Sequence, residues 1–471
     1  MIGHLLLWLY LGCSLGQLNT TPCTSNDECQ SVFGWARVCE EETGFCEQAE
    51  MEDRCTQTWP EDLWQNLDEY QDHILLGVDY ELESYALEVA SMRLAVQQVN
   101  NTGGLKGREF ALIECENAGD ASSDGLSQDA ASDAIARWLA DDVGVPAIIG
   151  PGTSGRTETA FEIAEPHGTM MISPSATSPA LTALDGLVST DSDPGLLWRT
   201  VAPDTLQAMV IAADMEAREI ENIAIIYQNG AYGDGIQEGF CDEYAGDCLD
   251  GNLFKFTNSA QISDHVTDIA NADFDEVLFV SSEEEDAVEF LLRAGNTAGM
   301  TNIGIFLTDA AAYEGVFAAA EEASHLFPRI RGTRPTIDET SSVYISFYES
   351  FELETGMQPT DAFAAHSFDA AWLVIYGAAW AIYQEGEVSG LGIARGLRQV
   401  SRDTEVNIRP SSWSTVKAHF QDGLSIDVIG ASGALDYDTA TGETTTPIEI
   451  WLVEEEEDGS WAFVQESVTN P

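Results

Sequence analysis

From residue 72 to the C-terminus, short apolar runs alternate with segments of helical spacing, and this alternation constrains the fold more than any other feature. The run at 73–78 is apolar enough for a buried strand, and the segment at 86–100 repeats apolar residues at the helical period. Strands that alternate with helices form parallel sheets covered by helices. The same rhythm predicts strands at 110–113, 145–149, 169–172, 223–227, 276–280, 303–307, 447–453 and 461–464, and helices at 128–140, 156–165, 205–217, 235–244, 284–294 and 362–384. The predicted class is α/β, and two sets of similar rhythm indicate two similar lobes.

The charge balance excludes several kinds of partner. Lysine and arginine number 19 and aspartate and glutamate number 81, which gives a formal net charge of −62. A chain without a positive surface cannot neutralise phosphates, so we expect no nucleic-acid partner, and an anionic membrane surface would repel it. The composition resembles that of halophile proteins, in which salt screens the carboxylates. The alternative is an acidic surface that serves only solubility.

The first 20 residues indicate a signal peptide and tether. Their apolar run at 5–11 is too short to span a bilayer. It ends in Leu-Gly-Cys, which resembles a bacterial lipobox, so we expect a lipid on Cys13 and a protein held on the periplasmic or cell-surface face of a membrane. Ser14 resembles a signal for the outer membrane. Cleavage without lipid is the alternative. No later apolar run reaches 18 residues, so we expect membrane contact only through the anchor.

The other eight cysteines indicate an oxidising compartment. Four of them lie within 23–46, in a Cys-rich segment at 21–55 that has no C-x-x-C pair and no histidine, which favours a small module with two disulfides over a zinc site. Three connectivities are possible there. Cys241 and Cys248 are near enough in sequence for a local bridge, and the remaining Cys55 and Cys115 would tie a polar linker at 56–71 to the main body, unless Cys115 is a buried free thiol. The four cysteines of the module are Cys23, Cys29, Cys39 and Cys46.

The loop GPGTSG at 150–155 matches the G-x-G-x-x-G pattern of dinucleotide sites, but we interpret it differently. The next predicted strand ends in MISPS at 171–175, without the acidic residue that would hold a ribose, so we expect no cofactor. A loop of Gly, Ser and Thr at a helix N-terminus can still bind an anion such as a carboxylate, because its N–H groups point outward. Thr153 and Ser154 add hydroxyl donors. The alternative is a plain helix cap formed by one of these two residues.

Two longer segments resemble the type I periplasmic solute-binding proteins, above all the leucine/isoleucine/valine-binding branch, also called the receptor family ligand-binding region. These segments are AIIGPGTSG at 147–155 and MISPSATSPALT at 171–182. Further segments resemble the family's turns, crossovers and helices in the same order, across roughly residues 72–465. They are NTGGLKG at 101–107, WRTVAPD at 198–204, YGDG at 232–235, RGTRP at 331–335, SFDAA at 367–371 and GASGALDY at 430–437. The Cys-rich leader resembles that of some bacterial lipoproteins, particularly myxobacterial ones.

The resemblance implies two lobes joined by three crossover strands, with a ligand in the cleft between them. The expected N-terminal lobe is 72–201 with 332–431, and the expected C-terminal lobe is 202–331 with 432–471. In the family, the equivalent residues bind the carboxylate and ammonium of an amino acid or cover it. The matching positions are Ser154, Ser175, Ala176, Thr177, Tyr232 and Asp309. For each of them, turn or cap chemistry is the alternative.

Two departures from the family concern the side chain of the ligand. The first loop, at 79–85, is acidic where the family has glycines, and VSSE at 280–283 stands where the other lobe has an aromatic residue. The sequence therefore predicts a binding protein, without catalysis, metal or cofactor, for a small amino acid or amide-like ligand. Its expected partner is an ABC transporter permease. The alternative is a sensory receptor that signals to a partner protein.

Overall fold

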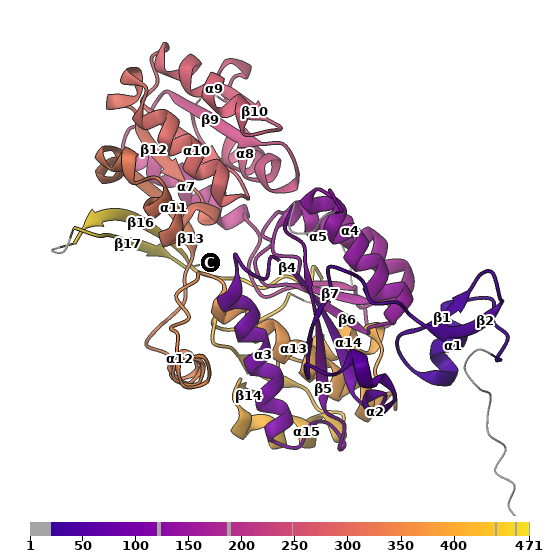
Figure 1. The fold of residues 1–471 in the computed structure, drawn as a ribbon. Coiled ribbons are helices and arrows are strands. Elements are labelled where there is room, and N and C mark those ends of the chain that lie inside the picture. Colours follow the sequence, from indigo (N-terminus) through magenta and orange to yellow (C-terminus); the bar gives the residue numbers. More distant parts are fainter. Residues whose placement is uncertain are drawn as a thin grey trace, which may run out of the picture.

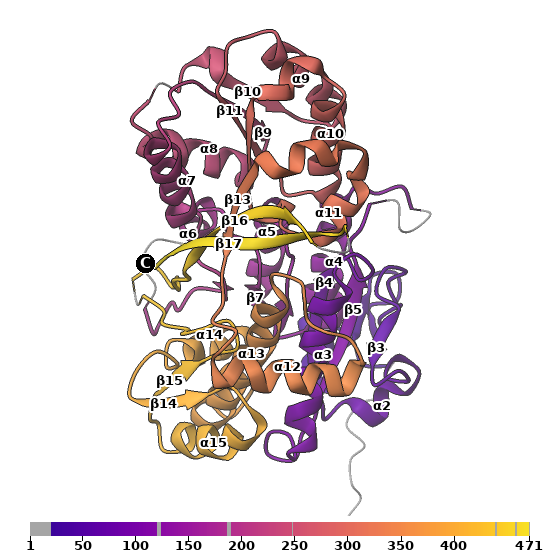
Figure 2. The ribbon, with the colours of Figure 1, turned by 90° about the vertical axis from the view of Figure 1, so that its left-hand side faces the viewer.

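The computed structural model describes residues 20–119, 124–185, 190–246, 248–438, 440–456 and 459–470. Two lobes, each built around its own sheet, lie one above the other (Figures 1 and 2). Cys13, the expected lipid site, lies outside the described residues, as does most of the expected signal segment.

The first lobe, which we call the N lobe, contains a six-stranded sheet in the order β3-β5-β4-β6-β7-β8. Its strands run parallel, except for the edge strand β3, which is antiparallel to β5. All seven residues of β4 are buried, as expected for a central parallel strand covered on both faces. The strands are β3 (Gln57–Trp59), β4 (Ile74–Tyr80), β5 (Phe110–Glu116), β6 (Ala147–Ile149), β7 (Met170–Ser173) and β8 (Leu197–Arg199).

Helices cover both faces of this sheet. Helix α3 packs against α13, and α4 packs against α5, and the two pairs lie on opposite sides of the sheet (Figure 1). Helix α13 is buried along most of its 21 residues because α3, α14 and α15 surround it. The helices of this lobe are α2 (Leu67–Tyr70), α3 (Ala86–Asn101), α4 (Gln128–Arg137), η2 (Trp138–Val143), α5 (Ser154–Ala164), α6 (Ala180–Leu184), α12 (Ser342–Thr355), α13 (Ala364–Gln384), α14 (Gly390–Leu397) and α15 (Trp413–Gln421), with the small pair β14 (Thr404–Asn407) and β15 (Ile426–Ile429).

The second lobe, the C lobe, contains a seven-stranded mixed sheet in the order β10-β9-β11-β12-β13-β16-β17. Strands β9 to β13 are parallel, whereas β16 is antiparallel to β13 and β17 is antiparallel to β16. Its elements are α7 (Thr205–Ala217), β9 (Ile223–Gln228), α8 (Ala231–Glu243), β10 (Leu253–Phe256), α9 (Ala260–Ala270), β11 (Glu276–Val280), α10 (Glu284–Gly295), β12 (Gly304–Leu307), η6 (Asp309–Ala311), α11 (Glu314–Ala319), β13 (Ile330–Pro335), β16 (Ile448–Glu455) and β17 (Trp461–Thr469).

The chain passes between the lobes three times, from β8 to α7, from β13 to α12 and from β15 to β16. The hydrophobic cores follow this division. One cluster joins buried residues of the N-lobe sheet to those of α12–α15, and separate clusters fill the C lobe. The predicted α/β architecture of two lobes with three crossovers is thus confirmed.

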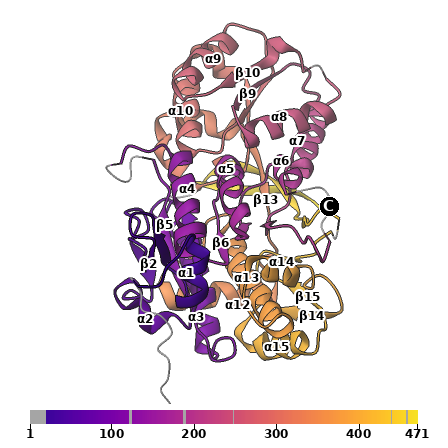
Figure 3. The same cartoon turned by 90° about the vertical axis from the view of Figure 1, so that its right-hand side faces the viewer.

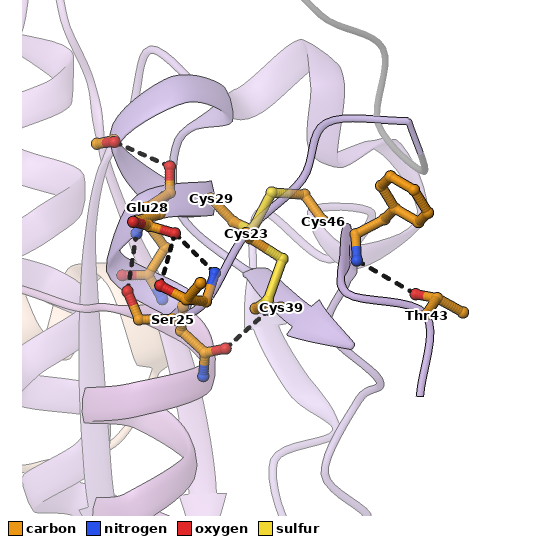
Figure 4. Close-up of a disulfide and its surroundings, with 12 residues drawn as sticks. Cys23, Ser25, Glu28, Cys29, Cys39, Thr43 and Cys46 are labelled. Atoms are coloured by element: carbon orange, nitrogen blue, oxygen red, sulfur yellow. Dashed lines mark hydrogen bonds between the residues drawn. A yellow bond between two sulfur atoms is a disulfide. The ribbon is translucent and has the colours of Figure 1, made fainter. Parts of the chain in front are cut away.

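A small disulfide module precedes the N lobe. It consists of α1 (Asn26–Phe33) and the antiparallel pair β1 (Arg37–Glu40) and β2 (Phe45–Gln48). Ser25 caps α1 by accepting from the N–H of Glu28, and the two bridges cross close to this cap (Figure 4). The bridges are Cys23–Cys39 and Cys29–Cys46, which selects one of the three possible connectivities.

The module is fixed to the outer side of the N lobe, away from the C lobe (Figures 1 and 3). Gln30 Nε2 donates to the carbonyl of Asp141 at 2.7 Å, and Ala36 N donates to the carbonyl of Val143 at 2.8 Å, both in η2. From the other side, Trp138 Nε1 donates to the carbonyl of Glu50 at 3.0 Å. The module therefore forms part of the N-lobe body.

Three local expectations differ from the structure. The segment 56–71 is more than a polar linker, because β3 pairs with β5 and the Cys55–Cys115 bridge joins the two segments. Helix α8 begins at Ala231 rather than 235, so Tyr232 lies in its first turn. Helix α5 begins at Ser154 rather than 156. The expected local bridge, Cys241–Cys248, is present. Within the described ranges, no helix is both long and apolar enough to cross a membrane.

Candidate functional site

The loop between β6 and α5 forms one wall of a cavity between the lobes. Gly152 is required there by close approach, because an added Cβ would lie 2.9 Å from the ring of Tyr80 and 3.1 Å from Ser175 Oγ. Thr153 precedes α5 and faces the cavity without capping the helix through its side chain. The first amides of a helix have no intrahelical partner, so this wall presents donors to whatever the cavity holds.

The turn after β7 lies beside this loop and is held by its own hydrogen bonds. Ser175 Oγ bonds to the carbonyl of Gly152 at 2.9 Å and to the hydroxyl of Tyr80 at 2.9 Å. Ser154 Oγ accepts from the N–H of Ser178 at 3.1 Å, which joins the turn to α5. Thr177 is 1% exposed and lines the cavity, and its hydroxyl has no hydrogen-bond partner among the described residues.

Ala176 does not line this cavity, in contrast to the expectation from the family motif. Its N–H donates to Ser173 Oγ at 3.0 Å, and its carbonyl accepts from Arg199 Nη1 at 3.2 Å. Both backbone groups of Ala176 therefore have partners within the protein.

The opposite wall comes from the C lobe and contains an acidic group. Asp309 Oδ1 accepts from Gln207 Nε2 at 2.9 Å and from the hydroxyl of Tyr232. Burial raises the pKa of the Asp309 carboxyl, although these two hydrogen bonds oppose the rise. Asp309 and Tyr232 thus meet in the cavity as the sequence predicts.

A second buried acid, Asp204, lies close to Asp309. Burial raises its pKa well above the usual range, and the charge of Asp309 adds to the effect. The hydroxyl of Thr177 lies close to Asp204 and opposes this rise in pKa. It makes no hydrogen bond of ordinary geometry to Asp204, and both carboxyl oxygens of Asp204 have no partner among the described residues. The positive charge of Arg199 also opposes the rise. Two neighbouring buried carboxyl groups favour a cationic group between them or a bound proton.

A buried ion pair connects the two lobes across the same cavity. Arg156 of α5 donates from Nη1 to Glu81 Oε1 at 2.6 Å, and from Nη2 to both oxygens of Glu283 at 2.9 and 3.0 Å. Glu81 belongs to the N lobe, and Glu283 precedes α10 of the C lobe. Burial works to lower the pKa of Arg156, but the charges of Glu283 and Glu81 outweigh burial and raise it. The guanidinium therefore stays charged and joins the lobes.

Aromatic rings complete the cavity, and sequence reasoning missed their role. Tyr85 contacts Tyr80 at 5.8 Å and Tyr313 at 5.9 Å between ring centroids, so the second contact also spans the lobes. The VSSE segment at 280–283 predicts that the C lobe has no aromatic residue facing the ligand. The structure differs, because Tyr313 of the C lobe lines the cavity. Tyr313 lies just after η6, far from that segment in sequence, and no local pattern marks it.

The cavity lies between the lobes and is lined by residues from both of them. It brings together six of the seven residues predicted to contact a ligand. Its lining comes from the N lobe (Tyr80, Glu81, Tyr85, Asn117, Gly152, Thr153, Ser154, Arg156, Ser175 and Thr177), from the C lobe (Tyr232, Ser282, Asp309, Ala310 and Tyr313) and from Phe363 just before α13. Uncharged donors on one wall and a carboxylate on the other can bind a molecule with one anionic and one cationic end.

Comparisons with known proteins agree with this architecture. The family described as "Periplasmic binding protein" matches residues 84–426. The substrate-binding protein BasB of a chemotactic signal transduction system from Halobacterium salinarum is 25% identical over 356 residues, which cover 74% of this chain and 75% of BasB. A leucine-, isoleucine-, valine-, threonine- and alanine-binding protein from Pseudomonas aeruginosa is 28% identical over 151 residues, or 32% of this chain and 36% of that protein. Among solved structures, the branched-chain amino acid transporter substrate-binding protein LivJ from Streptococcus pneumoniae, in complex with isoleucine, has a TM-score of 0.61 at 19% identity and covers 84% of this chain and all of LivJ.

Proposed function

The chain belongs to the periplasmic binding protein family, and we propose that it captures a small amino acid between its lobes outside the cytoplasm and delivers it to an ABC transporter. The observation that carries the proposal is the cavity itself, which is shared by both lobes and has donors on one wall and Asp309 on the other. Ligand contacts on both lobes stabilise a closed state, so capture needs no chemical step.

We place the ligand carboxylate against Thr153, Ser154 and Thr177, beside Ser175, whose hydroxyl holds the loop by donating to the carbonyl of Gly152. A chain with a net charge of −62 repels anions at long range, so a bound carboxylate needs short, preorganised donors. The buried and unpartnered hydroxyl of Thr177 is such a donor. We place the ligand ammonium against Asp309, which Gln207 and Tyr232 hold in position.

Calorimetric titration with an amino acid found in a thermal-shift screen tests this assignment. Thr177→Ala and Ser154→Ala should each bind about ten-fold more weakly or worse, because a hydrogen bond to a charged group contributes ~1.5–3 kcal/mol. Asp309→Asn should weaken binding through loss of the ammonium contact. Thr159→Ala, on α5 but outside the cavity lining, is the matched control and should bind like the wild type.

Two outcomes of the titration would contradict the proposal in different ways. Unchanged binding by folded Thr177→Ala and Ser154→Ala would move the site elsewhere. Unchanged binding by Asp309→Asn alone would mean that the ammonium contact is misplaced while the carboxylate site stands.

A sensory role is the second candidate function, because BasB is described as part of a chemotactic signal transduction system. The two roles differ in the receiving partner, a permease or a signalling protein, which co-purification with the membrane partner would identify. We further propose that acylation of Cys13 anchors the protein to a membrane. Metabolic labelling with a fatty-acid probe tests this anchor.

A further inference from the structure

One end of the cavity is polar where a site for an aliphatic side chain would be apolar. Its wall contains Glu81, Asn117, Arg156 and Ser282, with Glu283 directly behind Arg156. The proposed contacts with the carboxylate and ammonium use other residues, so this end is free to meet the side chain of the ligand.

The donors at this end are already used within the protein. The terminal nitrogens of Arg156 donate to Glu81, to Asn117 Oδ1 at 3.3 Å and to both oxygens of Glu283. Asn117 Nδ2 donates to Asp79 Oδ1 at 2.9 Å, and Ser282 Oγ donates to Gln228 Oε1 at 2.8 Å. A ligand side chain that needs donors, such as a carboxylate, therefore finds few of them here.

Hydrogen-bond acceptors and negative charge remain available at this end of the cavity. Glu81 Oε1 accepts from Arg156 and from Gln128, whereas its Oε2 accepts no hydrogen bond within the described ranges. The group of Glu81, Arg156 and Glu283 has two carboxyl groups for one guanidinium, so its net charge is −1 when both are ionised; burial raises the pKa of Glu283, and the charge of Arg156 opposes this rise. Such a group favours a ligand that brings N–H donors and positive charge.

The aromatic wall gives a second, independent reason to expect a cationic group in the ligand. The face of a tyrosine ring attracts cations. Tyr85 and Tyr313 both line this cavity, and their ring centroids lie 5.9 Å apart. Near them lies Glu88, which is 1% exposed and has an Oε2 without a partner among the described residues. Burial raises the pKa of its carboxyl well above the usual range, so Glu81 and the rings, rather than Glu88, are the groups expected to hold a cation. The three lysines of the chain contact other regions, so none of them balances these carboxylates.

We infer that the cleft selects an amino acid with a positively charged side chain, whose cationic group is held by Glu81 and the rings of Tyr85 and Tyr313. This inference rests on the proposed function and assigns its ligand class. A branched aliphatic side chain would instead cover the carboxylate of Glu81 without giving it a hydrogen bond, which is unfavourable.

Calorimetric titration of the full chain with four amino acids tests the inference. L-arginine and L-citrulline have nearly the same shape but differ in charge, and L-lysine and L-leucine extend the comparison. We expect L-arginine or L-lysine to bind at least about ten-fold more tightly than L-citrulline and L-leucine, because the contact to Glu81 is then charge-assisted. L-citrulline or L-leucine binding as tightly as both basic amino acids would overturn the inference and leave the proposed function intact. Binding of none of the four would overturn the inference, and the thermal-shift screen with the other amino acids would then decide the proposed function.

Two variants locate the selectivity. Glu81→Gln should reduce the preference for L-arginine over L-citrulline about ten-fold, whereas Glu83→Gln, an exposed neighbour in the same loop, should leave the preference unchanged. Because Glu81 also holds Arg156, the melting temperature of each variant must show that it is folded. Tyr85→Leu leaves that ion pair in place and should weaken the binding of L-arginine more than the binding of L-citrulline. A folded Glu81→Gln variant and a folded Tyr85→Leu variant that both keep the wild-type preference would overturn the inference.

Discussion

Asp79, at the end of β4, is a buried carboxyl group whose charge is stabilised by few partners. Burial raises its pKa to about 7, against the opposing effects of Asn117, Arg156 and Ser132. Asn117 Nδ2 and Ser132 Oγ both donate to Oδ1, and Oδ2 has no partner among the described residues. Asparagine can therefore replace Asp79 with its amide oxygen at the Oδ1 position, which keeps the existing hydrogen bonds.

We predict that Asp79→Asn flattens the pH dependence of stability. The folded pKa of about 7 lies above the unfolded value near 3.8, so the stabilising contribution is fully present below about pH 4 and is lost as the pH rises through 7. Between pH 5 and 8 the wild type should lose roughly 2–3 kcal/mol of unfolding free energy relative to the variant. Urea denaturation of both proteins at constant ionic strength measures this difference, and parallel curves would contradict the assignment.

At the same scale, the sequence predicts the residues of the site that lie in recognisable local motifs. Thr153 and Ser154 follow from a Gly-rich loop at a helix N-terminus, and Thr177 follows from the segment after Ile-Ser-Pro. Glu283 and Tyr313 do not follow, because they meet the N lobe only after the chain has crossed to the C lobe. Such contacts depend on how the lobes close, and no local pattern records that.

At the scale of elements, the strands and helices with strong apolar periodicity were predictable, and the weaker ones were not. Strand β4 and helices α3 and α7 lie close to the expected ranges because their buried residues repeat regularly. Strand β3 has three residues and no buried position, so its sequence resembles a linker, and only its pairing with β5 makes it a strand. Tertiary pairing overrides local preference at such an edge.

The disulfides offer a prediction at this scale. The Cys55–Cys115 bridge closes a sequence separation of 60 residues and fastens the β3 edge, whereas Cys241–Cys248 closes a separation of 7 residues. In the loop-entropy model, the double change Cys55→Ala with Cys115→Ala should cost about 4 kcal/mol, and Cys241→Ala with Cys248→Ala about 2 kcal/mol. Chemical denaturation under non-reducing conditions measures both. An equal or reversed order would show that loop closure does not dominate these contributions.

At the scale of the whole molecule, the excess of carboxylates should make stability depend on salt. The chain has 81 acidic and 19 basic residues, so 81 − 19 leaves 62 carboxylates without a lysine or arginine even if every basic residue is paired. The Debye length falls from ~10 Å at 0.1 M to ~3 Å at 1 M, which weakens their mutual repulsion.

We therefore predict that the melting temperature rises with sodium chloride between 0.1 and 1 M. A rise of at least about 2 °C is expected, the shift that ~1 kcal/mol produces in domains of 150–250 residues. Sucrose at matched osmolality is the control for non-ionic effects, and sulfate is avoided because it strengthens apolar burial in any protein. A flat or falling melting temperature in sodium chloride would remove the interpretation as adaptation to high salt.

We expect the ion pair between Arg156 and Glu283 to affect also how long a captured molecule stays. An enclosed molecule leaves when the lobes separate, and separation breaks both hydrogen bonds from Arg156 Nη2 to Glu283. Because these bonds join protein to protein, they delay every opening by the same factor, whatever molecule lies inside. The time for which the closed protein keeps its ligand thus depends in part on the protein itself. A receiving partner that attracts Glu283 away from Arg156 would shorten this time at the moment of delivery.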